Sequence, residues 1–236
     1  MRKTSLSLYT IRMIRNLAMP EEIILALEKK GIIAVLEIER ESDAVPIANA
    51  LLEGGVSAVE IALRTPAAEP SIPLIAENFP EMMIGIGTII EGGQAARVKR
   101  LAGVNFGVSP GINPTIVSEA LSCDLPFAPG IATPSELELA LSLGCRVVKF
   151  FPAEGMGGLS FLKSMDAPYK HLGVRYIPLG GVNQNNLADY AGANQILAIG
   201  GSWIASKELI NSANWGEITR GARAAKELWD TVRRSK

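Results

Sequence analysis

The chain has 236 residues, enough for one large domain or two small ones, with 48% hydrophobic and 20% charged residues. Its formal net charge is −1 with no long block of one sign, which gives no electrostatic reason to expect a nucleic acid or a membrane surface as partner. The single histidine, His171, excludes metal sites built on two histidines and leaves one imidazole for any serine or cysteine triad.

The first 18 residues differ from the rest of the chain because they contain several basic and hydroxyl residues and no acid. This composition resembles that of a transit peptide, but the apolar residues are too scattered for a secretory core or a membrane span. We therefore predict an N-terminal extension over residues 1–18. The two cysteines lack CxxC spacing, which suggests neither a zinc knuckle nor a disulfide framework, so the predicted location is the reducing cytoplasm.

Short apolar runs rich in β-branched residues recur along the chain roughly every 20–30 residues and predict strands. There are eight such runs, at residues 31–38, 57–63, 82–88, 104–109, 126–131, 145–151, 174–180 and 195–201. The segments between them predict helices, several of which open on a capping residue and close in glycine. These helices are expected at residues 43–53, 66–78, 94–102, 114–122, 135–143, 159–165, 185–191 and 203–210, with further helices at 19–30 and 215–234.

Near-continuous apolar strands that alternate with helices indicate a parallel sheet covered by helices. Eight such units in fewer than about 250 residues are typical of a single (β/α)8 barrel. We predict one barrel domain over residues 19–236 with an extra N-terminal helix. An open, doubly wound sheet stays the alternative because periodicity does not distinguish a closed sheet from an open one, although no GxGxxG follows the first strand.

Barrel enzymes carry their chemistry at the C-terminal ends of the strands, so polar residues there are the candidates for a site. Lys149 lies within an apolar run, where desolvation favours the neutral amine that a Schiff-base nucleophile needs. Glu60 and Arg64 share one face of the second strand about 13 Å apart, too far to pair with each other. They are expected to serve Lys149 and an anionic ligand, or else an internal salt-bridge network.

Small residues mark the ends of three other predicted strands. Thr88 ends the third strand with a hydroxyl group, in a GxGT sequence that also suits a plain tight turn. Glycine pairs end the last two strands at Gly180–Gly181 and at Gly200–Gly201, and Ser202 is expected to open a helix whose N-terminus favours an anion. We predict a phosphate site there. His171 precedes the seventh strand and is expected at the opposite end of the barrel.

Seven motifs in order along the chain resemble those of the bacterial 2-keto-3-deoxy-6-phosphogluconate (KDPG) and 4-hydroxy-2-oxoglutarate (KHG) aldolase family. They are residues 59–65 (VEIALRT), 85–88 (GIGT), 109–111 (SPG), 129–136 (PGIATPSE), 148–154 (VKFFPAE), 180–182 (GGV) and 199–203 (IGGSW). The resemblance runs from about residue 20 to the end of the chain, and residues 148–154 are its most specific part.

The resemblance implies a class I aldolase of the Entner–Doudoroff pathway, a homotrimer that needs no metal or other cofactor and acts on a phosphorylated keto acid to release pyruvate. Lys149 would be the Schiff-base lysine and Glu60 the general acid and base. The resemblance assigns the remaining substrate contacts as follows: Arg64 and Thr88 on the pyruvate carboxylate, Pro110 and Phe151 as pocket walls, and the amides near Gly180, Gly181, Gly201 and Ser202 on the phosphate.

One residue departs from the family pattern, because Leu179 stands where a threonine is expected before the glycine pair. The preferred substrate among KDPG, its galactonate epimer and KHG is therefore open. Two other functions also stay open on the residues alone: a phosphosugar isomerase or epimerase that uses the glycine pairs and Glu60 without an imine, and a non-catalytic barrel that binds a phosphorylated ligand.

Overall fold

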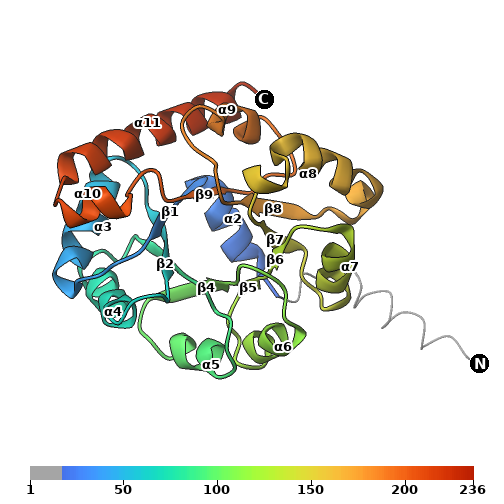
Figure 1. The fold of residues 1–236 in the computed structure, drawn as a ribbon, viewed down its shortest axis with the longest axis horizontal. Coiled ribbons are helices and arrows are strands. Elements are labelled where there is room, and N and C mark those ends of the chain that lie inside the picture. The colour runs from blue at the N-terminus through green and yellow to red at the C-terminus, as the bar shows by residue number, and fades with distance from the viewer. Residues whose placement is uncertain (1–17) are drawn as a thin grey trace, which may run out of the picture.

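The computed structural model describes residues 18–236, so the predicted extension lies outside the described residues except for Ala18. The alternation of strands and helices is confirmed (Figure 1). Each predicted run contains a strand, and the fifth contains two because Pro129 has no N–H to donate to the sheet. The strands are β1 (Ile32–Leu36), β2 (Ala58–Ala62), β3 (Met83–Gly87), β4 (Val104–Val108), β5 (Phe127–Ala128), β6 (Gly130–Ile131), β7 (Val147–Phe150), β8 (Arg175–Pro178) and β9 (Ile199–Gly201).

Helix α2 precedes β1 and lies at the centre of the view in Figure 1, whereas the helices that follow the strands lie around the outside. Thr133 and Glu136 form the predicted capping box, in which each side chain binds the backbone N–H of the other residue. The helices are α2 (Glu21–Lys30), α3 (Ala44–Glu53), α4 (Ala68–Asn78), α5 (Gln94–Lys99), α6 (Pro114–Ser122), α7 (Pro134–Ser142), α8 (Gly158–Asp166), α9 (Leu187–Ala191), α10 (Lys207–Asn211) and α11 (Trp215–Arg234), with 3-10 turns η1 (Glu41–Asp43), η2 (Glu154–Met156) and η3 (Ala167–Leu172).

All strand pairs in the described part of the chain are parallel. Six strands form one curled sheet in the order β5-β4-β3-β2-β1-β9, and the other three form a sheet in the order β6-β7-β8. Tyr176 of β8 also pairs with Ile196, which precedes β9. The curled six-stranded sheet is a half-barrel, and its parallel strands direct their C-terminal ends to one side of the molecule, where the candidate residues lie.

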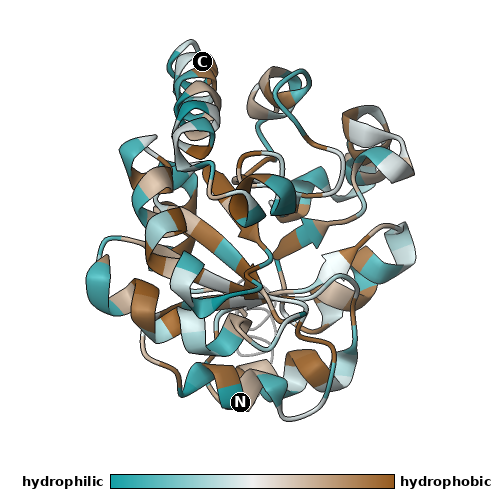
Figure 2. Cartoon of the chain, turned by 60° about the vertical axis from the view of Figure 1, so that its left-hand side comes forward, coloured by the Kyte–Doolittle hydropathy of each residue, from teal (hydrophilic) through white to brown (hydrophobic). Residues whose placement is uncertain are grey.

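Successive side chains of each strand enter two separate hydrophobic clusters. In β1, Ile32 and Ala34 pack in the larger cluster with the helices, whereas Ile33 packs in the smaller one. The smaller cluster joins interior residues of several strands with Ile24 and Leu27 of α2. Figure 2 shows the apolar residues concentrated on the strands and on the inward helix faces. Helix α2 therefore covers the interior from the end opposite the candidate residues.

The predicted start of the helix after β9 is wrong. Residues 202–205 form a turn, and α10 begins at Lys207 with the Ser206 hydroxyl accepting a hydrogen bond from the Leu209 N–H at 3.4 Å. The Trp203 ring lies against Gly201, where an added Cβ would be 1.6 Å from a ring carbon. With the Trp203 ring packed in this way, the chain makes a turn between β9 and α10. Ser202 therefore does not lie at the N-terminus of a helix. Within residues 18–236, no helix combines the length and apolarity that crossing a membrane requires.

Candidate active site

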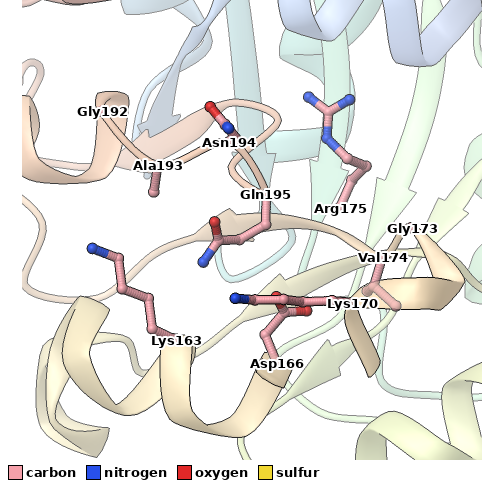
Figure 3. Close-up of a pocket in the computed structure, with 10 residues that line it drawn as sticks. All are labelled: Lys163, Asp166, Lys170, Gly173, Val174, Arg175, Gly192, Ala193, Asn194 and Gln195. Carbon is pink, nitrogen blue, oxygen red and sulfur yellow. The ribbon is translucent and has the colours of Figure 1, made fainter. Parts of the chain in front are cut away.

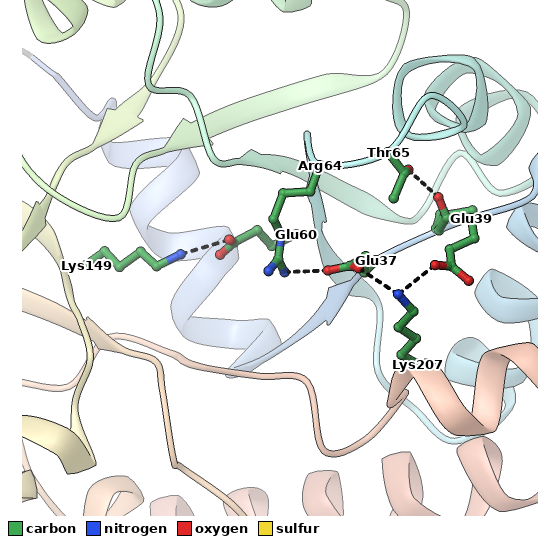
Figure 4. A network of polar contacts seen from close by, with 8 residues as sticks. Glu37, Glu39, Glu60, Arg64, Thr65, Lys149 and Lys207 are labelled. Atoms are coloured by element: carbon green, nitrogen blue, oxygen red, sulfur yellow. Dashed lines mark hydrogen bonds and ion pairs between the residues drawn. The ribbon is translucent and has the colours of Figure 1, made fainter.

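Lys149 of β7 and Glu60 of β2 meet inside the molecule (Figure 4). The Lys149 ammonium donates a hydrogen bond to Glu60 Oε1, with an Nζ–Oε1 distance of 2.8 Å. Only 7% of the Lys149 side chain and 5% of the Glu60 side chain are exposed. A buried ion pair adds little to stability because desolvating two charges offsets their attraction, so the pair calls for a chemical explanation.

The Glu60 carboxylate lies directly against the backbone of β3. A Cβ added at Gly87 would be only 2.2 Å from Glu60 Oε1 and 2.8 Å from its carboxyl carbon. Gly87 lies opposite Ala62 in the sheet, so the strand that carries Glu60 and the strand that limits it are hydrogen-bonded neighbours. The absence of a side chain at Gly87 therefore allows the carboxylate to reach Lys149.

Arg64 follows β2 and does not pair with Glu60. Its Nη2 atom lies 3.2 Å from Glu37 Oε2, and about half of its side chain is exposed. The next residue, Thr65, donates its hydroxyl to the backbone carbonyl of Ile38, which ties the β2 loop to the segment after β1. The guanidinium thus lies beside the mouth of the half-barrel, just after the strand that carries Glu60 (Figure 4).

Thr88 lies directly after β3 in a strained backbone conformation. Its φ of 63° is in the left-handed region, which a β-branched side chain disfavours. Such strain persists only where the surrounding structure imposes it, and it clusters at functional sites. Pro110, two residues after β4, packs its carbonyl against Gly130, where an added Cβ would be 2.2 Å from the Pro110 oxygen.

The aromatic ring of Phe151 lies next to Lys149. Its centroid is 5.4 Å from Lys149 Nζ, a cation–π distance. The same ring lies close to Gly180, where an added Cβ would be 3.2 Å from two ring carbons. The ring therefore connects the lysine to the glycine pair after β8.

The glycine pair after β8 has positive φ angles, 90° at Gly180 and 85° at Gly181. The backbone N–H groups of Ala153 and Glu154 donate to the carbonyls of Leu179 and Gly180 at 2.7 and 2.9 Å. These bonds hold the carbonyls of Leu179 and Gly180 toward the chain after β7. Gly201 ends β9 and Ser202 follows it, exposed at the same side of the molecule.

Glu37, Glu39 and Lys207 are polar residues of the mouth that the sequence reasoning missed. Lys207 Nζ lies 2.6 Å from Glu39 Oε1 and 3.3 Å from Glu37 Oε1 (Figure 4). These hydrogen bonds raise the pKa of Lys207 and lower that of Glu39. Part of the signal was available, since Glu37 lies near the end of the predicted strand run at residues 31–38, where polar residues are the candidates for a site.

The comparison with protein families matches residues 23–221 to the aldolase family described as KDPG and KHG aldolase. The chain belongs to this family. The match covers most of the chain, including every strand and every candidate residue described above.

Individual family members support this assignment. The chain is 40% identical to the 2-dehydro-3-deoxy-phosphogluconate aldolase of Treponema pallidum over 82% of this chain and 91% of that one. It is 37% identical to the KHG/KDPG aldolase of Escherichia coli K12 over 83% and 91% of the two chains. A crystal structure of the Legionella pneumophila KDPG aldolase, with pyruvate captured at low pH as a covalent carbinolamine intermediate, superposes with a TM-score of 0.80 at 35% identity, over 86% of this chain and 97% of that one.

Leu179, the departure from the family pattern, is buried at 4% exposure. A Cβ added at Gly200 would be 2.5 Å from the Leu179 side chain, so the leucine packs against β9 in the interior cluster. The position before the glycine pair therefore offers an apolar surface in place of a hydroxyl.

His171 lies in η3, shortly before the N-terminal end of β8, whereas the candidate residues lie at or near the C-terminal ends of their strands. Near it a cavity of about 550 Å3 lies at the N-terminal ends of β8 and β9 (Figure 3). Its lining includes Lys163, Lys170 and Gln195 and none of the candidate residues. In the described part of the chain, His, Cys, Asp and Glu side chains form no cluster of three or more that could hold a metal.

Proposed function

We propose that the chain is a class I aldolase that cleaves KDPG to pyruvate and glyceraldehyde 3-phosphate, with KHG as a second substrate that yields pyruvate and glyoxylate. The observation that carries this proposal is the buried Lys149–Glu60 hydrogen bond of 2.8 Å. It joins a nucleophile to an acid–base group within proton-transfer distance. Membership of the family and the pyruvate adduct of the Legionella pneumophila relative support it.

The hydrogen bond provides a route to the reactive form of the lysine. Moving one proton from Lys149 to Glu60 leaves a neutral amine and a neutral acid, and burial makes this transfer less costly than in water because both charges disappear. The amine attacks the C2 carbonyl of the keto acid to form a carbinolamine. Glu60 returns its proton to the departing hydroxyl, which leaves as water, and the product is a protonated imine on Lys149.

Cleavage uses the imine as the acceptor of electrons. The Glu60 carboxylate takes the proton of the C4 hydroxyl, the C3–C4 bond breaks, and its electron pair moves into the imine to give an enamine. The aldehyde product is released. Glu60 then gives its proton to C3, and water hydrolyses the resulting pyruvate imine to free the lysine amine. One carboxylate therefore carries every proton in turn.

Substrate binding is assigned to the residues around this pair. Arg64 and the Thr88 hydroxyl bind the carboxylate of the keto acid, Phe151 and Pro110 form the walls of the pocket, and amides near Gly180, Gly181, Gly201 and Ser202 bind the phosphate. The phosphate assignment rests on the glycine pair that follows β8 and the glycine pair that ends β9, and does not involve a helix N-terminus.

We infer that residues 19–236 form one domain in which the two sheets close into an eight-stranded barrel. Only Pro129 separates β5 from β6, and Tyr176 of β8 exchanges backbone hydrogen bonds of 2.9 Å with Gln195 and Leu197, just before β9. We also propose that the barrel assembles as a homotrimer. Light scattering should then give three times the chain mass of 25.1 kDa. A cytoplasmic location stays a prediction.

The test is a coupled assay that measures pyruvate release from KDPG. The wild-type protein should release pyruvate, and Lys149→Met should not, whereas Lys163→Met at the far cavity should keep the wild-type rate. Glu60→Gln should lower kcat by about 10²–10⁴-fold. Pyruvate release by Lys149→Met, or a phosphosugar isomerised by the wild-type protein without any pyruvate, would contradict the proposal.

A further inference from the structure

Three charged side chains from three separate elements form a chain of ion pairs at the mouth of the half-barrel (Figure 4). Arg64, after β2, pairs with Glu37, after β1, at 3.2 Å between Nη2 and Oε2. The second oxygen of Glu37, Oε1, lies 3.3 Å from Nζ of Lys207 in α10. Glu37 therefore lies between two cations and uses a different oxygen for each.

Arg64 depends on Glu37 for its position. Among residues 18–236, Glu37 is the one side chain that pairs with the Arg64 guanidinium, and 53% of the Arg64 side chain is exposed. A long exposed arginine samples many rotamers, and fixing it costs entropy at the moment of binding unless another group has already ordered it. The ion pair occupies Nη2, so Nε and Nη1 stay available to a ligand.

Glu37 is in turn held in place by Lys207 of α10. Lys207 binds Glu39 at 2.6 Å as well as Glu37, and Asn211 donates to the second oxygen of Glu39 at 2.9 Å. Both Lys207 and Asn211 belong to α10, which thereby ties the C-terminal part of the chain to the segment after β1. Lys207 also balances the charge of Glu37, so that Glu37 repels an incoming carboxylate less than an unpaired acid would.

We propose that Glu37 is a positioning residue that, supported by Lys207, orients the Arg64 guanidinium for the carboxylate of the keto-acid substrate. This inference rests on the proposed function, in which Arg64 binds that carboxylate. Glu37 touches neither the substrate nor the reacting atoms. Its contribution is to order Arg64 before the substrate arrives, so its loss weakens binding more than it slows the chemical step.

The test compares Glu37→Ala, Glu37→Gln and Lys207→Met in steady-state cleavage of KDPG. A second readout is the pyruvate concentration that gives half-maximal borohydride trapping. Glu37→Ala should raise KM and this pyruvate concentration about tenfold while kcat changes less than about threefold. Glu37→Gln keeps a side-chain oxygen beside Arg64 and should stay within about threefold of wild type in both KM and the pyruvate concentration for half-maximal trapping. Lys207→Met should give a KM and a trapping concentration between those of Glu37→Ala and Glu37→Gln.

The matched control is Glu69→Ala, which breaks a similar ion pair, Arg97–Glu69 at 2.7 Å, between α4 and α5. It should change neither KM nor trapping. If Glu37→Ala and Glu37→Gln leave KM unchanged, or lower it because Glu37 competes with the substrate for Arg64, the positioning role is overturned while the aldolase proposal stands. A wild-type protein that forms no pyruvate imine overturns both. A melting temperature that falls in Glu37→Ala without a change in KM would show a structural role only.

Discussion

Adding a single methyl group at Gly87 should disable the site without removing any polar group. The new Cβ would lie 2.2 Å from Glu60 Oε1, whereas unbonded carbon and oxygen atoms normally stay more than about 3.2 Å apart. The carboxylate must therefore move by about 1 Å. Gly87 is not among the glycines with positive φ, so alanine fits its backbone and the effect comes from the contact alone.

The displacement acts on the 2.8 Å hydrogen bond between Glu60 and Lys149. A misplacement of about 1 Å in a catalytic group costs about 10²-fold in rate, so we expect Gly87→Ala to lower kcat/KM by that factor. Crowding a packed interior lowers the free energy of unfolding by about 1–3 kcal/mol, which corresponds to a fall in melting temperature of roughly 2–12 °C for a chain of this size.

The assay is pyruvate release from KDPG, with folding checked by circular dichroism and thermal melting. The control is Gly92→Ala, because a Cβ added at Gly92 meets nothing within 4 Å and its kcat/KM should stay within about twofold of wild type. A folded Gly87→Ala protein with wild-type kcat/KM would refute the reasoning, since it would mean that the position of the Glu60 carboxylate does not matter for the reaction.

Two further predictions concern stability together with function or pH. Thr88→Gly should relieve the left-handed backbone strain and raise the free energy of unfolding, measured by urea titration, by about 1 kcal/mol. The same variant should have a lower kcat/KM because the hydroxyl is lost. A less stable variant with full activity would contradict this prediction. Burial raises the pKa of the Cys145 thiol from 9.0 to about 12, so the unfolded chain loses this proton first as pH rises above 9 and stability falls up to pH 12. Between pH 8 and pH 10 the wild type should lose about 1.4 kcal/mol more of its free energy of unfolding than Cys145→Ala, and equal losses in the two proteins would refute the assignment.

The strand positions could be predicted from the sequence because buried parallel strands leave apolar runs, and each run contains a strand. The division of the fifth run at Pro129 was also readable in principle, since proline cannot donate to a sheet. The start of α10 was not, because the packing of Trp203 on Gly201 depends on where the chain turns after β9. Periodicity likewise left closure of the sheet undecided.

The candidate site was partly readable for a different reason. Lys149 and Glu60 stood out as charges inside apolar runs, but their contact joins residues 89 positions apart and depends on the curl of the sheet. Neither the contact nor its distance follows from the two runs alone. The position of Glu37 near the end of its run could be read from the sequence, but its significance depends on the side chains that the fold places beside it, Arg64 and Lys207.

The measurement that tests the central claim most directly is borohydride reduction of the wild-type protein in the presence of pyruvate, followed by peptide mass spectrometry. The account predicts one irreversible adduct per chain, of the mass of a reduced pyruvate imine, on the peptide that carries Lys149. Glu60→Gln should still be trapped, though more slowly. An unmodified Lys149 peptide, or an adduct on a different lysine, would contradict the account.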